Sequence, residues 1–203
     1  MNIPNAHISG AVEGLVDEAI LKRLMRSVGA EPGPIYGRQG KNYLLQRIAG
    51  FDKAAAREPW FVLVDLDRDF DCAPPAKNVW LPNASQQMCF RIAVREVEAW
   101  LLADKERIAE FLCVRPSMVP DDPESQTDPK LSMIALARRS RRRAIRQDMV
   151  LREGSGRDTG PAYTSRMIEF ATNEVAGWRP DRAAKSSDSL RRCIERLEQL
   201  VFQ

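Results

Sequence analysis

The stretch from Pro59 to Asp71, which reads PWFVLVDLDRDFD, constrains the fold more than any other part of this sequence. Its first half, Trp60–Val64, is an almost unbroken run of β-branched, aromatic and aliphatic residues. Such a run is typical of a strand that is buried on both faces of a parallel sheet. The run ends in acidic residues rather than in an ordinary turn. The sequence therefore predicts a buried strand that carries carboxylates at its carboxyl end.

The first two of these acids, Asp65 and Asp67, are separated by one residue. Alternate residues of an extended chain point the same way, so we expect both carboxylates on one face, roughly 7 Å apart. Two anions at this spacing repel by about 2–3 kcal/mol at an effective dielectric constant of 20. A magnesium or manganese ion would offset that repulsion, because hard carboxylate oxygens suit these cations. The alternative is a solvated acidic loop with an arginine such as Arg68 nearby.

Composition narrows the kinds of chemistry that remain. The 203 residues suit one domain, or one domain with a small appendage. His7 is the only histidine and the four cysteines form no CxxC pair, so histidine triads and zinc sites are nearly excluded. Any chemistry should rest on carboxylates. We expect no secretory leader and no segment near the roughly 20 apolar residues that span a bilayer, and hence a cytoplasmic protein without a membrane anchor.

A second acidic position follows the first predicted strand. The strand His7–Val12 runs into Glu13, and a helix over Leu15–Val28 is predicted directly after it. Glu13 should therefore lie at the carboxyl end of a strand, where open α/β sheets bind ligands. Asp17 and Glu18 lie inside the first helical turn, and we ascribe them to a favourable interaction with the helix dipole.

A third acidic junction follows the predicted strand Met88–Val94. The segment REVEAWLLAD comes next, and a helix is predicted over Glu96–Phe111. Glu96 and Glu98 are two residues apart, so on a helix they face different ways and at most one of them points into a shared site. The residues alone leave the choice between the two open.

The order of these elements predicts an α/β fold with a parallel-rich sheet of about four strands flanked by helices. We expect one α/β domain over residues 1–128 and a helical C-terminal extension, residues 129–203, packed on the same domain. The remaining predicted elements are a short strand Ile35–Gly37, a helix Asn42–Ile48, a brief extended piece Val79–Leu81, a helix Pro161–Glu174 and a last helix capped by Ser186 or Ser187.

The C-terminal part contains a dense group of arginines within a predicted helix, Leu131–Gln147. At 100° per residue, five of them fall within an arc of about 140° and form a basic stripe; these are Arg138, Arg139, Arg142, Arg143 and Arg146. The chain's net charge is only +3, so solubility does not require this concentration of charge. No aromatic residue is near them in the sequence, so a nucleic-acid phosphate backbone is the expected partner. A solvated face, or docking to an acidic protein, is the alternative.

Three acidic segments in order, VEGLVDEAIL, VLVDLDRD and EVEAWLLAD, resemble the TOPRIM domain. That domain is shared by topoisomerases, primases and nucleases of the overcoming-lysogenization-defect type. The segments look still more like an uncharacterised bacterial family of stand-alone TOPRIM-like proteins, whose members are often proposed to work beside an ATPase in phage defence. The wider resemblance covers about the first half of the chain. The closer one extends through the arginine helix to the segment Gly160–Tyr163.

The resemblance implies a metal-dependent nuclease that hydrolyses phosphodiester bonds in DNA or RNA. Glu13, Asp65 and Asp67 match the family's catalytic acids and metal ligands. Glu98 is our choice for a fourth ligand, with Glu96 as the alternative, and together they would hold one or two Mg²⁺ or Mn²⁺ ions. Glu13 acting as a general base is a further alternative. The chain shows no topoisomerase strand-transfer domain and no ATPase motif. The competing interpretation is a non-catalytic metal-binding module that regulates or contacts an ATPase partner.

Overall fold

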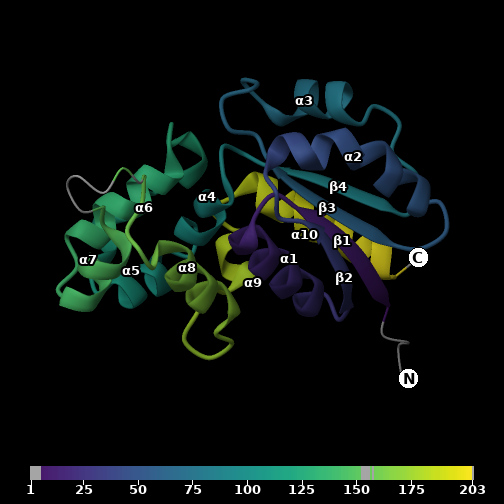
Figure 1. Ribbon diagram of the computed structural model, residues 1–203. Coiled ribbons are helices and arrows are strands. Elements are labelled where there is room, and N and C mark those ends of the chain that lie inside the picture. The colour runs from purple at the N-terminus through teal and green to yellow at the C-terminus, as the bar shows by residue number, and fades with distance from the viewer. Residues whose placement is uncertain (1–5, 152–155, 157, 203) are drawn as a thin grey trace.

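Four parallel strands form the centre of the molecule in the computed structural model, which describes residues 6–151, 156 and 158–202 (Figure 1). The strands are β1 (His7–Val12), β2 (Glu31–Gly37), β3 (Trp60–Asp65) and β4 (Met88–Ala93), and they lie side by side in the order β2-β1-β3-β4. The predicted α/β fold with a parallel sheet and a helical C-terminal part is confirmed. Because β1 and β4 flank β3, the three acidic junctions expected from the sequence open at the same edge of the sheet.

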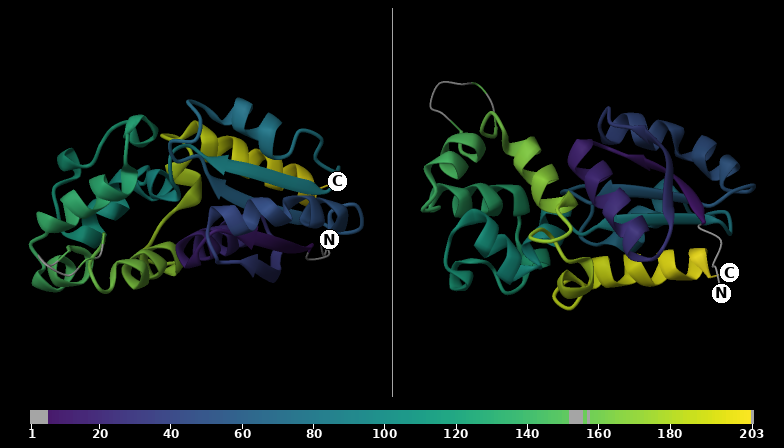
Figure 2. Two further views of the ribbon diagram at one scale, coloured as in Figure 1. Left: turned by 45° about the horizontal axis from the view of Figure 1, so that its top comes forward. Right: turned by 90° about the horizontal axis from the view of Figure 1, so that it is seen from below.

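Helices cover both faces of this sheet. The helices α1 (Leu15–Ser27) and α10 (Asp188–Val201) lie on one face, and α2 (Lys41–Ala54) and α3 (Ala73–Trp80) lie on the other (Figures 1 and 2). Strand β3 supplies both cores, because Phe61 and Leu63 pack towards α1 while Val62 and Val64 pack towards α2. The unbroken apolar run in the sequence is therefore explained by a strand buried on both faces.

The rest of the chain forms a helical part beside the carboxyl edge of the sheet (Figures 1 and 2). Its helices are α4 (Val97–Leu102), α5 (Lys105–Leu112), α6 (Pro129–Arg138), α7 (Arg143–Met149), α8 (Tyr163–Thr172) and α9 (Pro180–Ala183), with short 3₁₀ turns at Pro116–Met118 and Pro123–Ser125. Two fully buried tryptophans join this part to the sheet's core, and Trp178 Nε1 donates to the carbonyl of Trp100 at 2.9 Å.

The single arginine helix expected over residues 131–147 is wrong. The chain forms α6 and α7 with a break between Arg138 and Arg143. The break is stabilised by the buried Ser140, whose hydroxyl accepts the N–H of Arg142 at 3.1 Å, and whose carbonyl accepts a hydrogen bond from Arg146. An arc counted on one continuous helix therefore does not describe these side chains.

Other differences concern where helices begin and end. The helix predicted over residues 96–111 is divided into α4 and α5 at Asp104, whose buried carboxylate accepts hydrogen bonds from the backbone and the guanidinium of Arg179. The extended piece expected at residues 79–81 is wrong, because α3 continues to Trp80. The final helix begins as predicted, with the Ser187 hydroxyl accepting the N–H of Leu190 at 3.2 Å.

The close pairing of β1 with the end of β2 generates a stability prediction. Gly37 has a φ of 93°, and a Cβ atom there would lie 2.1 Å from the carbonyl oxygen of Val12. Gly29 has a φ of 81°, but nothing lies within 4 Å of its Cβ position. We expect Gly29→Ala to cost about 1–2 kcal/mol of unfolding free energy from backbone strain alone, and Gly37→Ala to cost about 1–3 kcal/mol more from overlap.

Urea unfolding of the two variants beside the wild type measures this difference. Equal losses for Gly29→Ala and Gly37→Ala would contradict the close approach of Gly37 to Val12.

Candidate functional site

Asp65, the last residue of β3, joins the three acidic junctions. Its backbone N–H donates to Oε1 of Glu13, which follows β1, at 2.7 Å. Its own Oδ1 accepts the N–H of Val97, the first residue of α4, at 3.0 Å. These two hydrogen bonds link the ends of β1 and β3 to the helix that follows β4. The carboxylates predicted at residues 13 and 65 are therefore brought together at the carboxyl edge of the sheet.

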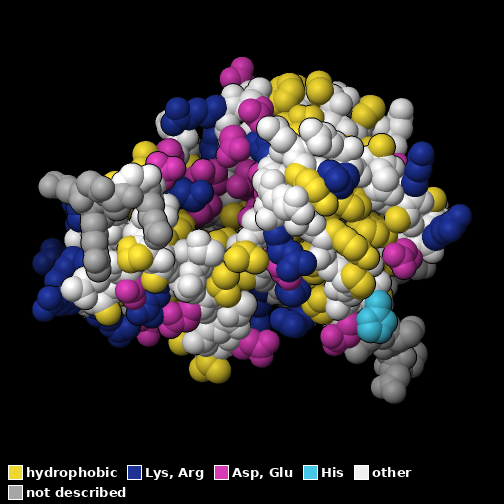
Figure 3. Space-filling view, in the orientation of Figure 1, with side chains coloured by type: hydrophobic (Ala, Val, Ile, Leu, Met, Phe, Trp, Pro, Cys, Tyr) yellow, Lys and Arg dark blue, Asp and Glu magenta, His cyan; other side chains and the backbone are white. Residues whose placement is uncertain are grey.

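A pocket of about 220 Å³ opens beside Asp65. Three carboxylates and one amine line it, and these belong to Asp17, Asp65, Glu98 and Lys130; the remaining lining residues are Gly14, Leu15, Val16, Val97, Thr159, Tyr163 and Thr164. We call this the acidic pocket. Figure 3 shows acidic side chains gathered in the hollow between the sheet and the helical part. Five elements far apart in the sequence contribute to it.

The structure places Glu98, rather than Glu96, in the acidic pocket with Asp65. Glu98 is buried, and its Oε1 accepts the hydroxyl of Tyr163 at 3.1 Å and lies 3.8 Å from Nζ of Lys130. Glu96 points elsewhere, because its Oε2 accepts the backbone N–H of Lys130 at 2.9 Å, and it lines a neighbouring pocket. The two-residue spacing at the start of α4 thus separates the directions of these acids.

Asp17 is a site residue that the sequence reasoning assigned to the helix dipole instead. Its side chain is only 7 % exposed and lines the acidic pocket, and its Oδ1 has no hydrogen-bond partner among the residues that the structure describes. A Cβ atom on Gly14 would lie 3.1 Å from Oδ2 of Asp17, so a glycine leaves room for this carboxylate. The sequence signal for it is the Glu13–Gly14 pair followed by an acid one helical turn later.

Asp67 does not line the acidic pocket, although its carboxylate lies close enough to add to the effect of burial, which raises the pKa values of Asp65, Glu13 and Asp17. Strand β3 ends at Asp65, and Asp67 has a φ of 51°, so the alternation of an extended chain does not reach it. Its Oδ2 is bound by Nζ of Lys41 at 2.5 Å, and the same amine contacts Asp69 at 2.8 Å. Lys41 therefore pairs with Asp67 and Asp69, and its charge also opposes the rise that burial causes in the pKa of Glu13.

The surroundings of the acids in the pocket favour their neutral form. Burial raises the pKa of Asp65 well above its usual value, and the neighbouring carboxylates of Asp17, Glu13 and Glu98 raise it further. Burial also raises the pKa of Glu13 to about 7, against the opposing effects of the Asp65 N–H and of Lys41. The pKa values of Asp17 and Glu98 are raised by burial as well, although Lys130 opposes this. The acidic pocket is therefore lined by three carboxylic acids and, among the described residues, by one cation, Lys130.

The excess of carboxylic acids over cations raises the question of whether these residues suit a divalent cation. The donors are hard carboxylate oxygens, which Mg²⁺ and Mn²⁺ prefer, and Oδ1 of Asp17 has no hydrogen-bond partner in the described part of the chain. Within residues 6–151, 156 and 158–202, no three acidic, histidine or cysteine side chains converge with metal-ligating geometry. The donor chemistry fits the ion, whereas the positions of Asp17, Asp65 and Glu98 in this structure do not form a ligand set, because Asp65 Oδ1 and Glu98 Oε1 accept hydrogen bonds from Val97 and Tyr163.

The arginines predicted to bind nucleic acid lie at the turn between α6 and α7. Arg138, Arg139, Arg142 and Arg143 are exposed, whereas Arg146 is partly buried and donates to the Ser140 carbonyl. Helix α6 begins at the acidic pocket with Lys130 and ends at this turn. At 1.5 Å per residue, Lys130 and Arg138 are about 12 Å apart along the helix axis.

No protein-family model, no curated protein and no solved structure matches this chain. The resemblance to the TOPRIM domain therefore remains a prediction from the residues. No helix in the described part of the chain is long and apolar enough to cross a membrane.

Charge repulsion in the acidic pocket generates a prediction about pH. Because burial raises the folded-state pKa values, these acids do not reduce the free energy of unfolding while the pH is below their unfolded pKa of about 4. Above that pH the free energy of unfolding falls, and the loss is complete once the pH has risen through the folded pKa, which for Glu13 is about 7. We expect the metal-free protein to lose stability over this range, and Asp65→Asn to recover on the order of 2 kcal/mol above it.

Urea unfolding of metal-free protein at several pH values measures both effects. Asp71→Asn is the matched control, because Asp71 is exposed and outside the pocket. A wild type and an Asp65→Asn variant with parallel pH profiles would contradict the assignment.

Proposed function

We propose that this protein is a metal-dependent phosphodiesterase that acts on nucleic acid. The proposal is carried by the acidic pocket, where three buried or partly buried carboxylic acids are lined up beside a single lysine. A magnesium or manganese ion would supply the charge that activates water and stabilises a phosphodiester at its transition state. The TOPRIM-like order of the acidic segments supports the same activity.

Each residue of the pocket has a role that follows from its contacts. Asp17, Asp65 and Glu98 would hold the ion, with the Tyr163 hydroxyl fixing the orientation of Glu98. Burial alone would lower the pKa of Lys130, but the carboxylates of Glu98 and Glu96 outweigh it and raise that pKa. Lys130 therefore stays charged at neutral pH and would bind a phosphate oxygen.

Glu13 is suited to proton transfer. Its pKa of about 7 lies near the working pH, which is the favourable range for a general acid or base. Oε1 is held by the Asp65 N–H at 2.7 Å, so Oε2 is the oxygen that would take up or release the proton. This role for Glu13, rather than direct ligation, leaves the ion to the three acids that line the pocket.

A second candidate function is a non-catalytic metal-binding module that regulates an ATPase partner. The ion pairs of Lys41 with Asp67 and Asp69 favour it, because they occupy the carboxylate that the family resemblance assigns to metal. In either case we propose a cytoplasmic bacterial protein of an ATPase-coupled phage-defence system, with the exposed arginines contacting a nucleic-acid backbone.

Asp17 and Asp67 distinguish the pocket seen in the structure from the ligand set implied by the resemblance. We expect Mg²⁺ at about 100 times its Kd to stabilise the wild type by about 2.7 kcal/mol, because only the folded state binds it. Asp17→Asn should abolish this shift and the cleavage of plasmid DNA or RNA, whereas Asp67→Asn should retain both in part. Calorimetry and nicking assays, with chelator as control, test this. Loss in Asp67→Asn alone would restore the ligand set of the resemblance.

Lys130 separates metal binding from catalysis. Lys130→Gln removes a cation placed to stabilise transition-state charge, so we expect the cleavage rate to fall by about 10²–10³-fold. Metal affinity should be unchanged or higher, because a competing positive charge is gone. Lys105→Gln is the control, since Lys105 pairs with the exposed Asp121 outside the pocket. Equal rates for the two variants would remove Lys130 from the mechanism.

A further inference from the structure

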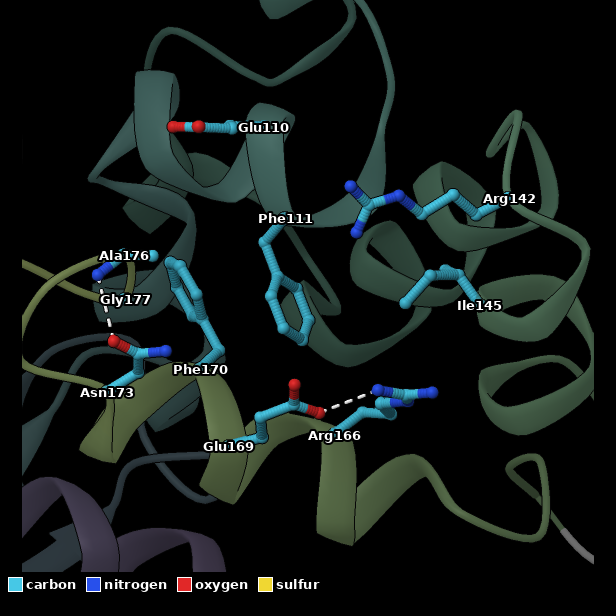
Figure 4. A pocket seen from close by; sticks show the side chains of 10 residues that line it. All are labelled: Glu110, Phe111, Arg142, Ile145, Arg166, Glu169, Phe170, Asn173, Ala176 and Gly177. Carbon is cyan, nitrogen blue, oxygen red and sulfur yellow. Dashed lines mark hydrogen bonds and ion pairs between the residues drawn. The ribbon is translucent and has the colours of Figure 1, made fainter.

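A second pocket, of about 200 Å³, lies in the helical part next to the exposed arginines. It brings together Phe111 of α5, Ile145 of α7 and Phe170 of α8, which are distant in the sequence (Figure 4). The two phenyl rings have centroids 5.0 Å apart and are tilted by 39°. Phe170 is fully buried and Phe111 is partly exposed, so one aromatic ring remains accessible beside a rigid apolar wall. The sequence placed no aromatic residue near the arginines, and the fold does.

Among the described residues, most of the charged side chains that line this aromatic pocket form ion pairs with each other or with neighbours, and one cation does not. Glu169 at the rim is paired with Arg166, which also binds Asp148, each at 2.7 Å. Glu110 is paired with Arg107 at 2.9 Å. Arg142 extends towards Phe111 from the opposite side (Figure 4) and has no ion-pair partner among the residues described.

Arg142 belongs to a larger exposed group at the α6–α7 turn. Its members are exposed and have no ion pair within the described part of the chain; they are Arg138, Arg139, Arg141, Arg142 and Arg143. A surface of this kind attracts a polyanion. The aromatic pocket thus opens directly beside the strongest local concentration of positive charge in the sequence.

A polar group at the pocket's edge is also oriented. Asn173 Oδ1 accepts the N–H groups of Val175 at 3.0 Å and of Ala176 at 2.8 Å. This fixes the side-chain amide, and its nitrogen makes no hydrogen bond to another described residue. An oriented donor next to an accessible ring suits a planar group with hydrogen-bond acceptors at its edge.

We propose that the aromatic pocket binds one nucleobase of a single-stranded nucleic acid while the arginines at the α6–α7 turn bind its neighbouring phosphates. Pockets for drug-sized ligands are roughly 300–1,000 Å³, so this one suits a single planar group. A base becomes available for stacking on an aromatic side chain only where it is not stacked in a duplex. The inference deepens the proposed function by specifying the form of the substrate.

Fluorescence anisotropy in chelator tests this binding without cleavage. The probes are a labelled single strand of about 12 nucleotides, within the range of known site sizes, the same strand with abasic sugars, and a duplex. We expect Phe111→Leu to weaken binding of the base-bearing strand by about tenfold and to leave the abasic strand unaffected. Circular dichroism checks that the variant is folded. Arg142→Gln should weaken both strands and lower the salt slope by about 0.7. Arg57→Gln, an exposed arginine after α2, is the control.

Several results would overturn the inference. These are equal binding of duplex and single strand, a Phe111→Leu effect of the same size on the abasic strand, and an Arg142→Gln variant that matches the control. Full competition by a free nucleoside monophosphate at the same concentration as the strand would assign the pocket to a small nucleotide instead. Since no metal is present, failure here leaves the metal-dependent activity of the acidic pocket to its own test.

Discussion

The hydrogen bonding of Asp65 at the end of the central strand is the constraint on which the site depends. Its partly buried carboxylate accepts the N–H of Val97, while its own backbone N–H donates to Glu13. The strand order brings these residues together, because β1 and β4 flank β3 and all three strands are parallel. One hydrogen-bonded residue therefore fixes the distance between the acidic junctions.

The surrounding core offsets the cost of this arrangement. Carboxylates that repel one another in the interior destabilise the metal-free fold, as the raised pKa values of Asp65 and Glu13 indicate. The two apolar cores on either face of the sheet are extensive enough to keep them in place. Two lysines supply partial compensation from opposite sides, Lys41 at Asp67 and Lys130 at Glu98. Under the proposed function, a bound cation would relieve the repulsion between these acids and stabilise the fold.

The sequence predicted those features that depend on local pattern. The buried strand β3, the parallel α/β order and the meeting of residues 13 and 65 follow from apolar runs that end in acids. Features that depend on distant contacts were not predictable, such as the Tyr163 hydroxyl on Glu98, 65 residues away. Asp17 was misassigned because an acid in a first helical turn has an ordinary explanation. The arginine helix failed because one buried side chain, Ser140, stabilises a break that propensity does not reveal.

Helix α8 connects the acidic pocket to the aromatic pocket, and helix α6 connects the acidic pocket to the arginine turn beside it. Helix α8 carries Tyr163 at the first and Phe170 at the second, and these residues are seven positions apart, or about 10 Å along the axis. Helix α6 runs from Lys130 to the arginine turn over a similar length. At about 3.4 Å per stacked nucleotide, this separation corresponds to roughly three nucleotides. A strand held by one base in the aromatic pocket would therefore present a phosphate a few nucleotides away to Lys130, and the rigid spacing of α6 and α8 would set which phosphodiester is cut.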